Sequence, residues 1–195
     1  MNICIFPGTF NPIHEAHLKM AYFALQKYKF DKIIFIPAYI PPHKEINSNL
    51  AEHRLHMVKL ATASNPKFAV SDIEYKSENK SYTLITVKKI KEQYNITNEI
   101  NMLIGTDAFA KIKTWYKVDE LKNLVHFIVF DRGIEINPEE YMDFNFEFAG
   151  MEFFDISSTN LRLGINEDKT NKEVREYIRQ NGLYGNWKDK TVAWS

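Results

Sequence analysis

The feature of this sequence that most constrains its fold is the regular alternation of short apolar runs with longer amphipathic stretches. Apolar runs at residues 3–6, 32–36 and 100–104 each end at a proline or glycine, as expected of buried strands. Helical patterns of about 12 to 16 residues separate such runs. This spacing predicts βαβ units, a parallel sheet and right-handed crossovers. Sheets of this kind bind ligands at the carboxyl ends of their strands, near the reversal of strand order.

Further elements are expected along the chain from the same patterns. Helices are expected at 18–28, at 50–61 with Asn49 as cap, and from Ser81 to Tyr94; strands at 68–75, 126–130 and 144–148; and short helices from Ser158 and near Asn171. Together they predict an α/β fold with a Rossmann-like, doubly wound, mostly parallel sheet. Helices should cover both faces, and a small helical portion should follow at the carboxyl end.

No feature of the sequence marks a boundary between domains. A chain of 195 residues suits one domain, or one domain with a small appendage, and no repeat, low-complexity tract or Gly/Ser-rich linker interrupts it. We expect a single domain over residues 1–184, whose helical part begins near residue 157. Residues 185–195 show no readable periodicity and are expected to form a tail.

Charge and cysteine content argue against several classes of function. Lys plus Arg and Asp plus Glu each number 25, so the formal net charge is zero. Neither nucleic acid nor a membrane is therefore expected as a partner, and any anion site must be built locally. The single cysteine, Cys4, excludes an internal disulfide and a cysteine-based zinc site. With no signal-peptide pattern and no apolar stretch near the ~18 residues of a membrane span, we expect a cytoplasmic protein.

The segment after the first expected strand has the residues of a phosphate site. Gly8 lets the backbone approach a ligand because it has no Cβ. The helix that follows offers free N–H groups and its positive dipole end. His14 and His17 are three residues apart, so both can lie on the same side of the first helical turn. Either histidine alone is more often a cap or a surface residue, but the whole segment favours a phosphate site.

Residue spacing argues against two other kinds of site. A metalloprotease helix needs His-Glu-x-x-His, whereas His17 comes one residue too early after His14 and no third ligand is in register. The seven glycines lack the spacing of a Walker loop or of a dinucleotide fingerprint.

A second anion-binding pattern lies near the carboxyl end. Ser157, Ser158 and Thr159 stand where a helix is expected to begin, and Arg162 lies one turn further along. Their hydroxyl and N–H groups, with the guanidinium fork, can bind one phosphate. Alone this pattern is a capped helix with a surface arginine. It gains weight from the phosphate site already expected after the first strand.

Taken together, these segments resemble the nucleotidyltransferases with an H-x-G-H signature, and within them the bacterial-type nicotinate mononucleotide adenylyltransferases. The resemblance covers nearly the whole chain as far as Tyr184. It is carried, in order, by Gly8-Thr9-Phe10-Asn11-Pro12-Ile13-His14 with His17, Pro41-Pro42-His43-Lys44, Ser81-Tyr82-Thr83, Gly105-Thr106-Asp107, Trp115-Tyr116-Lys117, Ile156-Ser157-Ser158-Thr159 with Arg162, and Gly182-Leu183-Tyr184.

The resemblance implies adenylyl transfer from ATP to nicotinate mononucleotide, which gives deamido-NAD and pyrophosphate. The attacking phosphate is already an anion near neutral pH, so alignment and charge neutralisation should supply the rate. A Mg²⁺ ion bridging the ATP phosphates is implied, with no metal ligands expected from the protein. The expected partners are these two small molecules, and the protein is expected to be a monomer or a homodimer.

The resemblance also implies roles for individual residues. Three are expected to be catalytic, namely His14, His17 and Arg162, with His17 stabilising charge in the transition state. The expected ATP and phosphate contacts are Gly8, Thr9, Phe10, Ser157, Ser158 and Thr159. The expected contacts to the acceptor nucleotide and its ribose are His43, Lys44, Thr83, Gly105, Asp107 and Trp115.

Several of these roles have alternatives. Trp115 would stack on the pyridine ring or be an ordinary core or rim aromatic, and Asp107 would bind a ribose diol, cap a helix, or do both. His43 and Lys44 would bind the mononucleotide phosphate or be solvated loop residues. The chain also departs from the family pattern at three positions: Pro7 and Ala16 stand where glycine is usual, and Ile85 stands where aspartate is frequent.

Other functions stay open. Nicotinamide mononucleotide or phosphopantetheine would be the acceptor in related enzymes, although the alkyl chain of phosphopantetheine would leave Trp115 without a purpose. A non-catalytic nucleotide sensor is the alternative from another class. The presence of His14, His17 and Arg162 argues against it, because binding alone would not need all three.

Overall fold

The computed structural model describes residues 1–44, 46–77, 80–185 and 187, and within them six strands form one sheet. The strand order is β3-β2-β1-β4-β5-β6, and every neighbouring pair is parallel. The strands are β1 (Ile3–Gly8), β2 (Lys32–Pro37), β3 (Phe68–Val70), β4 (Ile100–Gly105), β5 (Val125–Phe130) and β6 (Phe146–Phe148). The α/β, Rossmann-like class expected from the sequence is confirmed.

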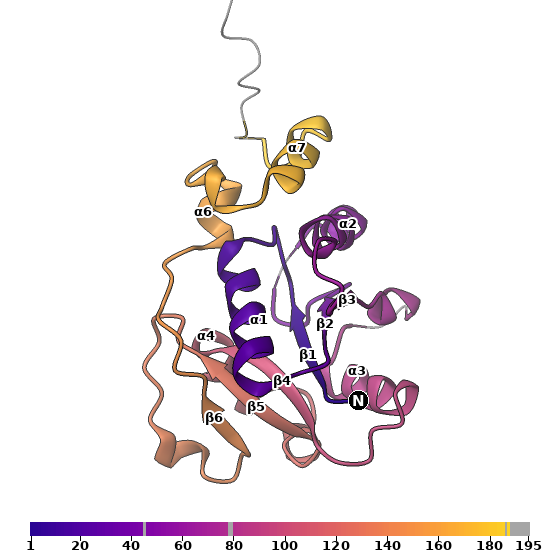
Figure 1. The fold of residues 1–195 in the computed structure, drawn as a ribbon, viewed down its shortest axis with the longest axis vertical. Coiled ribbons are helices and arrows are strands. Elements are labelled where there is room, and N and C mark those ends of the chain that lie inside the picture. Colours follow the sequence, from indigo (N-terminus) through magenta and orange to yellow (C-terminus); the bar gives the residue numbers. More distant parts are fainter. Residues whose placement is uncertain (45, 78–79, 186, 188–195) are drawn as a thin grey trace, which may run out of the picture.

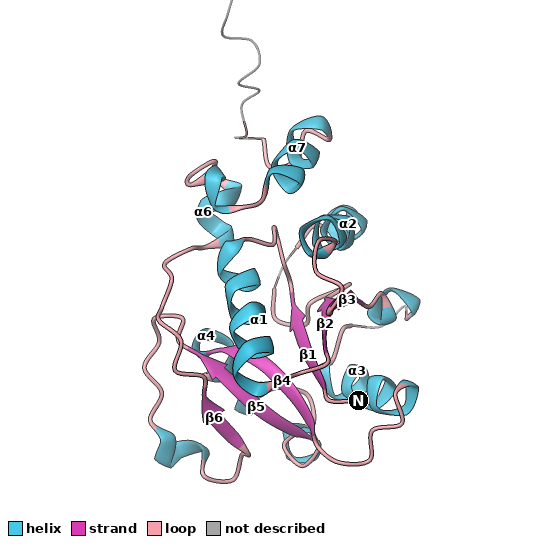
Figure 2. Cartoon of the chain, viewed as in Figure 1, coloured by secondary structure: helices cyan, strands magenta, loops and turns pink. Residues whose placement is uncertain are grey.

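Helices cover both faces of this sheet (Figure 1, Figure 2). The α-helices are α1 (Glu15–Tyr28), α2 (Ala51–Thr62), α3 (Thr83–Gln93), α4 (Thr106–Phe109), α5 (Val118–Leu121), α6 (Ser158–Arg162) and α7 (Lys172–Gln180). Short 3₁₀ turns connect some of them: η1 (Ser48–Leu50), η2 (Ile73–Lys76), η3 (Ile112–Thr114), η4 (Pro138–Tyr141) and η5 (Glu167–Lys169).

Two hydrophobic clusters, one on each face, hold the layers together. Because successive side chains of a strand point to opposite faces, Cys4 and Phe6 join the cluster that also contains residues of α1, α2, α6 and α7. Ile3 and Ile5 join the other cluster, with residues of α3, α4 and α5. Burial on both faces explains why the strands read as continuous apolar runs rather than as alternating ones.

The strand order reverses at β1, which pairs with β2 on one side and with β4 on the other. The loops that leave the carboxyl ends of these strands therefore diverge and open a crevice. The helices α6 and α7 lie at this end of the sheet, α6 near the beginning of α1 and α7 beside α2 (Figure 1).

Several predicted element details are wrong. The strand predicted at 68–75 ends at Val70, and η2 replaces its second half. Asn49 does not cap α2, which begins at Ala51 after Leu50; Asn47 caps the preceding turn η1, where its side chain accepts a hydrogen bond from the backbone N–H of Asn49. Ser81 does not open a helix, since α3 begins at Thr83.

Two further corrections concern which side chains are buried. The three- and four-residue spacing of apolar residues in the sequence predicts that Tyr22 lies on the buried face of α1. The buried residues of this helix are instead Ala16, Met20, Ala21 and Ala24, and Tyr22 is 42% exposed. Trp187, expected in the tail, is only 8% exposed and its indole N–H donates to the Leu161 carbonyl at 2.7 Å. Residues 188–195 of the expected tail lie outside the described residues.

Candidate active site

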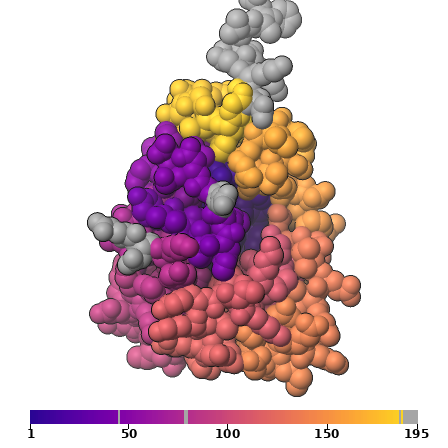
Figure 3. Space-filling model, turned by 180° about the vertical axis from the view of Figure 1, so that it is seen from behind, coloured from indigo at the N-terminus to yellow at the C-terminus, as the bar shows by residue number. Residues whose placement is uncertain are grey.

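The carboxyl ends of β1 and β4 open into one cavity of about 910 Å³. In Figure 3 it is a hollow whose deep indigo floor lies between the purple residues near position 50 and the orange residues near position 160. Every residue that the sequence assigned to the site lines it: Gly8, Thr9, Phe10, His14, His17, His43, Lys44, Thr83, Gly105, Asp107, Trp115, Ser157, Ser158, Thr159 and Arg162. Segments about 150 residues apart therefore meet at one cavity. Its volume lies within the ordinary range for small-molecule sites.

His14 and His17 form a stacked pair at the start of α1. Their ring centroids lie 3.8 Å apart, and Nδ1 of His17 accepts a hydrogen bond from the backbone N–H of His14 at 3.2 Å. Because Nδ1 accepts, the proton of a neutral His17 must sit on Nε2, which makes that nitrogen a donor. Nδ1 of His14 is buried and has no hydrogen-bond partner among the described residues.

Burial keeps this imidazole pair neutral. Removal from water and, to a smaller extent, the positive charge of Arg132 together lower the pKa of His14 to about 3. The pKa of His17 is also held well below its ordinary value, first by burial and then by His14, Arg132 and Lys44. Near neutral pH each ring therefore offers one N–H group and carries no charge of its own.

Gly8 is required here for a different reason from the one expected. A Cβ at this position would lie 2.7 Å from Cζ of Phe10, so the close approach that needs glycine is to the protein's own ring. That ring is buried and packs against Phe6, Phe35 and His17, with centroids 5.0–5.8 Å away. Phe10 thus supports the floor of the site, and its side chain faces the core.

Side chains from the carboxyl end hold the loop before α1. Three successive carbonyls accept hydrogen bonds from them: Asn11 from Arg162 at 2.8 Å, Pro12 from Ser158 at 3.0 Å and Ile13 from Thr170 at 2.8 Å. The Tyr184 hydroxyl adds a bond to the Asn11 side chain at 2.5 Å. This loop is therefore shaped by residues more than 140 positions away in the chain.

The serines of this region have roles within the protein: Ser157 is the helix cap that the sequence offered as the ordinary interpretation, and the contact of Ser158 was not predicted. The Ser157 hydroxyl caps α6 by accepting from the N–H groups of Thr159 and Asn160, and the Ser158 hydroxyl is bound to the loop. Arg162 also donates to the Thr159 hydroxyl at 3.1 Å. A guanidinium carries five N–H donors, so Arg162 retains donors beyond these two contacts.

The residues expected to bind the acceptor come from separate elements on the other side of the cavity. Thr83 begins α3, Trp115 follows η3, and His43 and Lys44 lie in the loop after β2. Trp115 is half-buried against the second hydrophobic cluster. Asp107 is exposed in the first turn of α4, where its carboxylate accepts from the backbone N–H of Ala108 at 3.0 Å, although the cap position itself belongs to Gly105.

Arg132 also lines the cavity, although the sequence patterns did not predict it there. Its guanidinium donates to the carbonyls of Phe154 and Ile156, at 3.0 and 2.7 Å, and so fixes the chain that leads into α6. A Cβ on Gly105 would lie 2.5 Å from Cγ of Arg132, so this contact requires glycine there. The available signal was position, because Arg132 follows the carboxyl end of β5, where ligand-binding residues gather.

Arg54 is a second missed residue, and no pattern in the sequence would have revealed it. Its guanidinium is fully buried and donates to the carbonyls of Thr9, Ala38 and Tyr39. It thereby joins the loops after β1 and β2. A lone arginine in a helical pattern ordinarily indicates a surface residue.

The described residues hold neither a cluster of metal ligands nor a membrane-spanning helix. Within the described ranges, no three His, Cys, Asp or Glu side chains gather as a metal-binding group. No helix in that part of the chain is long and apolar enough to cross a membrane.

A parallel sheet with a cavity at its reversal of strand order, lined here by Lys44, Lys111, Arg132 and Arg162, is the arrangement in which α/β proteins bind their ligands. Residues 5–164 match the family described as cytidylyltransferase-like. The probable nicotinate-nucleotide adenylyltransferase of Fusobacterium nucleatum is 39% identical over 92% of this chain and 98% of its own length. The nicotinate-nucleotide adenylyltransferase of Bacillus subtilis is 37% identical over 93% and 97%. The chain belongs to the cytidylyltransferase-like family and, within it, to the nicotinate-nucleotide adenylyltransferases, which confirms the resemblance.

Solved structures show the same fold. The nicotinic acid mononucleotide adenylyltransferase of Plasmodium falciparum, complexed with NaAD, matches with a TM-score of 0.78 over 94% of this chain and 97% of that one, at 21% identity. The same Plasmodium protein complexed with APC matches with a TM-score of 0.75, at 20% identity.

Proposed function

We propose that this protein transfers the adenylyl group of ATP to nicotinate mononucleotide, giving deamido-NAD and pyrophosphate. The observation that carries the proposal is the meeting of His14, His17 and Arg162 at one cavity, together with the acceptor-side residues. The activity named for its relatives over nearly their whole length supports it.

The reaction needs alignment rather than a nucleophilic side chain. A phosphate oxygen of the mononucleotide forms a bond to the α-phosphorus of ATP as the bond from that phosphorus to the bridging oxygen breaks, and pyrophosphate leaves with the electron pair. The attacking oxygen is already ionised near neutral pH, so no proton has to be removed. Holding both substrates in line and stabilising the charge that develops on the phosphates then accounts for catalysis.

The proposed roles of the phosphate-side residues follow from their geometry. His17 donates from Nε2 to a phosphate oxygen, as the bond accepted at its Nδ1 requires. His14 stacks on it and adds a second imidazole beside the start of α1. Arg162 uses its remaining donors for the departing pyrophosphate. Burial makes each of these contacts stronger than it would be in water.

The acceptor occupies the opposite side of the cavity in this proposal. Trp115 stacks on the pyridine ring, Thr83 faces its carboxylate, and Asp107 accepts from the ribose hydroxyls. His43 and Lys44 reach the mononucleotide phosphate from the loop after β2. All five residues line the same cavity as the histidine pair.

We further propose that ATP enters with its Mg²⁺ ion. The ion neutralises charge on the triphosphate and is held through phosphate oxygens and water, which suits a small, strongly hydrated cation. The described part of the chain offers no cluster of three or more acidic, His or Cys ligands for it. Cytoplasmic location, a monomeric or homodimeric state and the lack of a nucleic-acid partner stay predictions.

The decisive experiment is pyrophosphate release from ATP with three acceptors compared side by side. We expect the highest kcat/KM with nicotinate mononucleotide, a lower value with nicotinamide mononucleotide, and no release with phosphopantetheine. Preference for phosphopantetheine would refute the proposed acceptor. ATP binding without release for any acceptor would favour a nucleotide sensor instead.

A further inference from the structure

The three residues that follow β2 are fixed to an unusual degree. All six backbone polar groups of Ala38, Tyr39 and Ile40 have partners. The N–H group of Ala38 donates to the Gly8 carbonyl at 2.9 Å. The N–H group of Tyr39 donates to the Glu74 carboxylate at 3.3 Å and to the Ser81 hydroxyl at 3.0 Å, and that of Ile40 donates to the same hydroxyl at 3.1 Å. The carbonyls of Ala38 and Tyr39 accept from the Arg54 guanidinium at 2.6 and 3.0 Å, and the Ile40 carbonyl accepts from the Ser81 N–H at 2.9 Å. We call Ala38–Ile40 the anchored segment.

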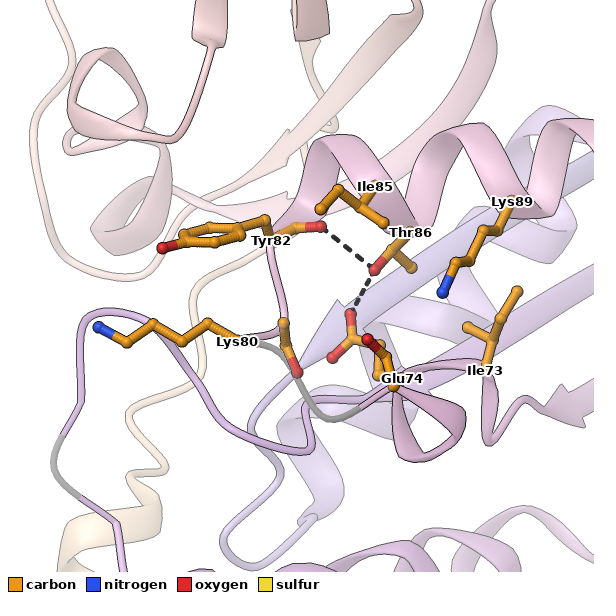
Figure 4. Close-up of a pocket in the computed structure, with 9 residues that line it drawn as sticks. Ile73, Glu74, Lys80, Tyr82, Ile85, Thr86 and Lys89 are labelled. Carbon is orange, nitrogen blue, oxygen red and sulfur yellow. Dashed lines mark hydrogen bonds between the residues drawn. The ribbon is translucent and has the colours of Figure 1, made fainter.

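Glu74 is the acidic member of this arrangement and is itself 7% exposed. Its Oε2 accepts from the Tyr39 N–H, and its Oε1 accepts from the Thr86 hydroxyl at 2.7 Å. Figure 4 shows Glu74 on η2 facing Thr86 of α3, with Tyr82 at the beginning of that helix. One carboxylate therefore ties the anchored segment to α3.

Both sides of the acceptor region depend on this connection. The chain leaves the anchored segment directly into Pro41, Pro42, His43 and Lys44, which line the cavity. From Ser81 it passes through Tyr82 to Thr83, which also lines the cavity. Glu74 and Ser81 are thus the points at which the two acceptor-binding segments are joined.

A carboxylate suits this position better than an amide. Two donors approach it from different elements, and Ser81 lies within hydrogen-bonding reach as a further partner. An ionised carboxylate only accepts, whereas an amide would turn an NH₂ group toward one of these donors. Burial raises the pKa of Glu74, and the hydrogen bonds from Ser81, Thr86 and Tyr39 and the charge of Arg54 oppose that rise.

We propose that Glu74 is a positioning residue for the acceptor mononucleotide: through Tyr39 and Ser81 it sets the distance between the His43–Lys44 loop and Thr83. It acts through these segments and does not touch the reacting phosphates. This inference rests on the proposed function, since it assumes that the acceptor lies between those segments.

The test compares Michaelis constants for the two substrates in Glu74→Gln. We expect the KM for nicotinate mononucleotide to rise about tenfold, the effect of weakening one or two buried hydrogen bonds, while kcat and the KM for ATP stay within about twofold. Ser81→Ala, which removes the acceptor shared by Tyr39 and Ile40, should give the same pattern. Ser81→Ala also provides the test if Glu74→Gln does not fold.

The matched control is Thr170→Val, which removes a hydrogen bond on the ATP side of the cavity. It should change ATP parameters and leave the KM for the mononucleotide unaffected. An unchanged acceptor KM in both Glu74→Gln and Ser81→Ala, or equal rises for both substrates, would overturn the inference while leaving the proposed function intact. A wild-type protein that turns over no pyridine mononucleotide would overturn both.

Discussion

The smallest unit of the site is the stacked pair His14 and His17. Both residues have depressed pKa values because burial disfavours the imidazolium ion. In the proposed mechanism the neutral pair would therefore act on a phosphate by directed N–H donation, while positive charge comes from Arg132 and Arg162 at the same cavity. Hydrogen bonding and charge are divided between different residues.

Replacing His17 should separate catalysis from binding. We expect His17→Ala to lower kcat about 100-fold or more, with the KM for ATP changed much less, because its N–H acts on charge that develops in the transition state. Steady-state pyrophosphate release measures both constants. Near-normal turnover would remove the role assigned to this residue.

The depressed pKa of His14 predicts a pH dependence of stability. The unfolded chain binds a proton near the ordinary imidazole value of 6.5, whereas the folded chain does so only at about 3. Between these values the unfolded state holds more protons, so the free energy of unfolding falls as pH drops below 6.5. Urea unfolding of the ligand-free protein at about pH 7.5 and about pH 5 should show this loss.

His14→Asn is the matched variant for that measurement. The variant lacks one imidazole that the folded protein buries in its neutral form. The free energy of unfolding of the variant should therefore fall less steeply between the two pH values. An equal loss in the variant and the wild type would show that His14 is not responsible.

At the scale of elements, the loop between β1 and α1 is shaped mainly from outside. Arg162, Ser158 and Thr170 bind three consecutive carbonyls, of Asn11, Pro12 and Ile13. The loop therefore takes its form only when α6 and the chain before α7 are in place. The proposed phosphate site at the beginning of the protein depends in this way on its carboxyl-terminal quarter.

Thr170→Val tests this dependence with little change in shape. Thr170 is buried, and loss of its hydroxyl leaves the Ile13 carbonyl without that donor. We expect a loss of about 1–3 kcal/mol in the free energy of unfolding, with a several-fold rise in the KM for ATP. Thr170→Ser keeps the hydroxyl and should retain the wild-type KM; the same rise in the serine variant would point to packing instead.

At the scale of the whole molecule, the carboxyl-terminal helices and the sheet share one hydrophobic cluster. Leu161, Val174, Ile178 and Trp187 belong to the same cluster as Cys4 and other residues of the sheet. Movement of α6 relative to the sheet would therefore disturb the core as well as the site.

Trp187→Ala should measure how much of the stability depends on this shared cluster. Removing a buried tryptophan costs about 3–5 kcal/mol, and the bond to the Leu161 carbonyl is lost with it. Urea unfolding of the variant and the wild type measures this change in the free energy of unfolding. Trp187→Phe keeps an aromatic ring in the cluster and loses the N–H group, so it should cost only about 1 kcal/mol. If Trp187→Ala lowered the free energy of unfolding by less than about 1 kcal/mol, Trp187 would contribute little to stability.

The sequence by itself determined the parts of this protein that depend on local pattern. Buried strands at 3–6 and 32–36, the helix between them and the phosphate pattern around His14 each follow from the types and spacing of neighbouring residues. Parallel topology then places the loops that leave the carboxyl ends of the strands at the same end of the sheet. This is why every candidate site residue was found at one cavity.

Only the tertiary structure decided the partners of individual polar groups. It showed that Gly8 makes room for Phe10, that Ser158 binds a loop 146 residues away, and that Arg54 and Glu74 are buried. The physical reason is that a hydrogen bond depends on distance in space. Nothing in the local pattern of a serine or an arginine tells which carbonyl the packed chain brings within 3 Å.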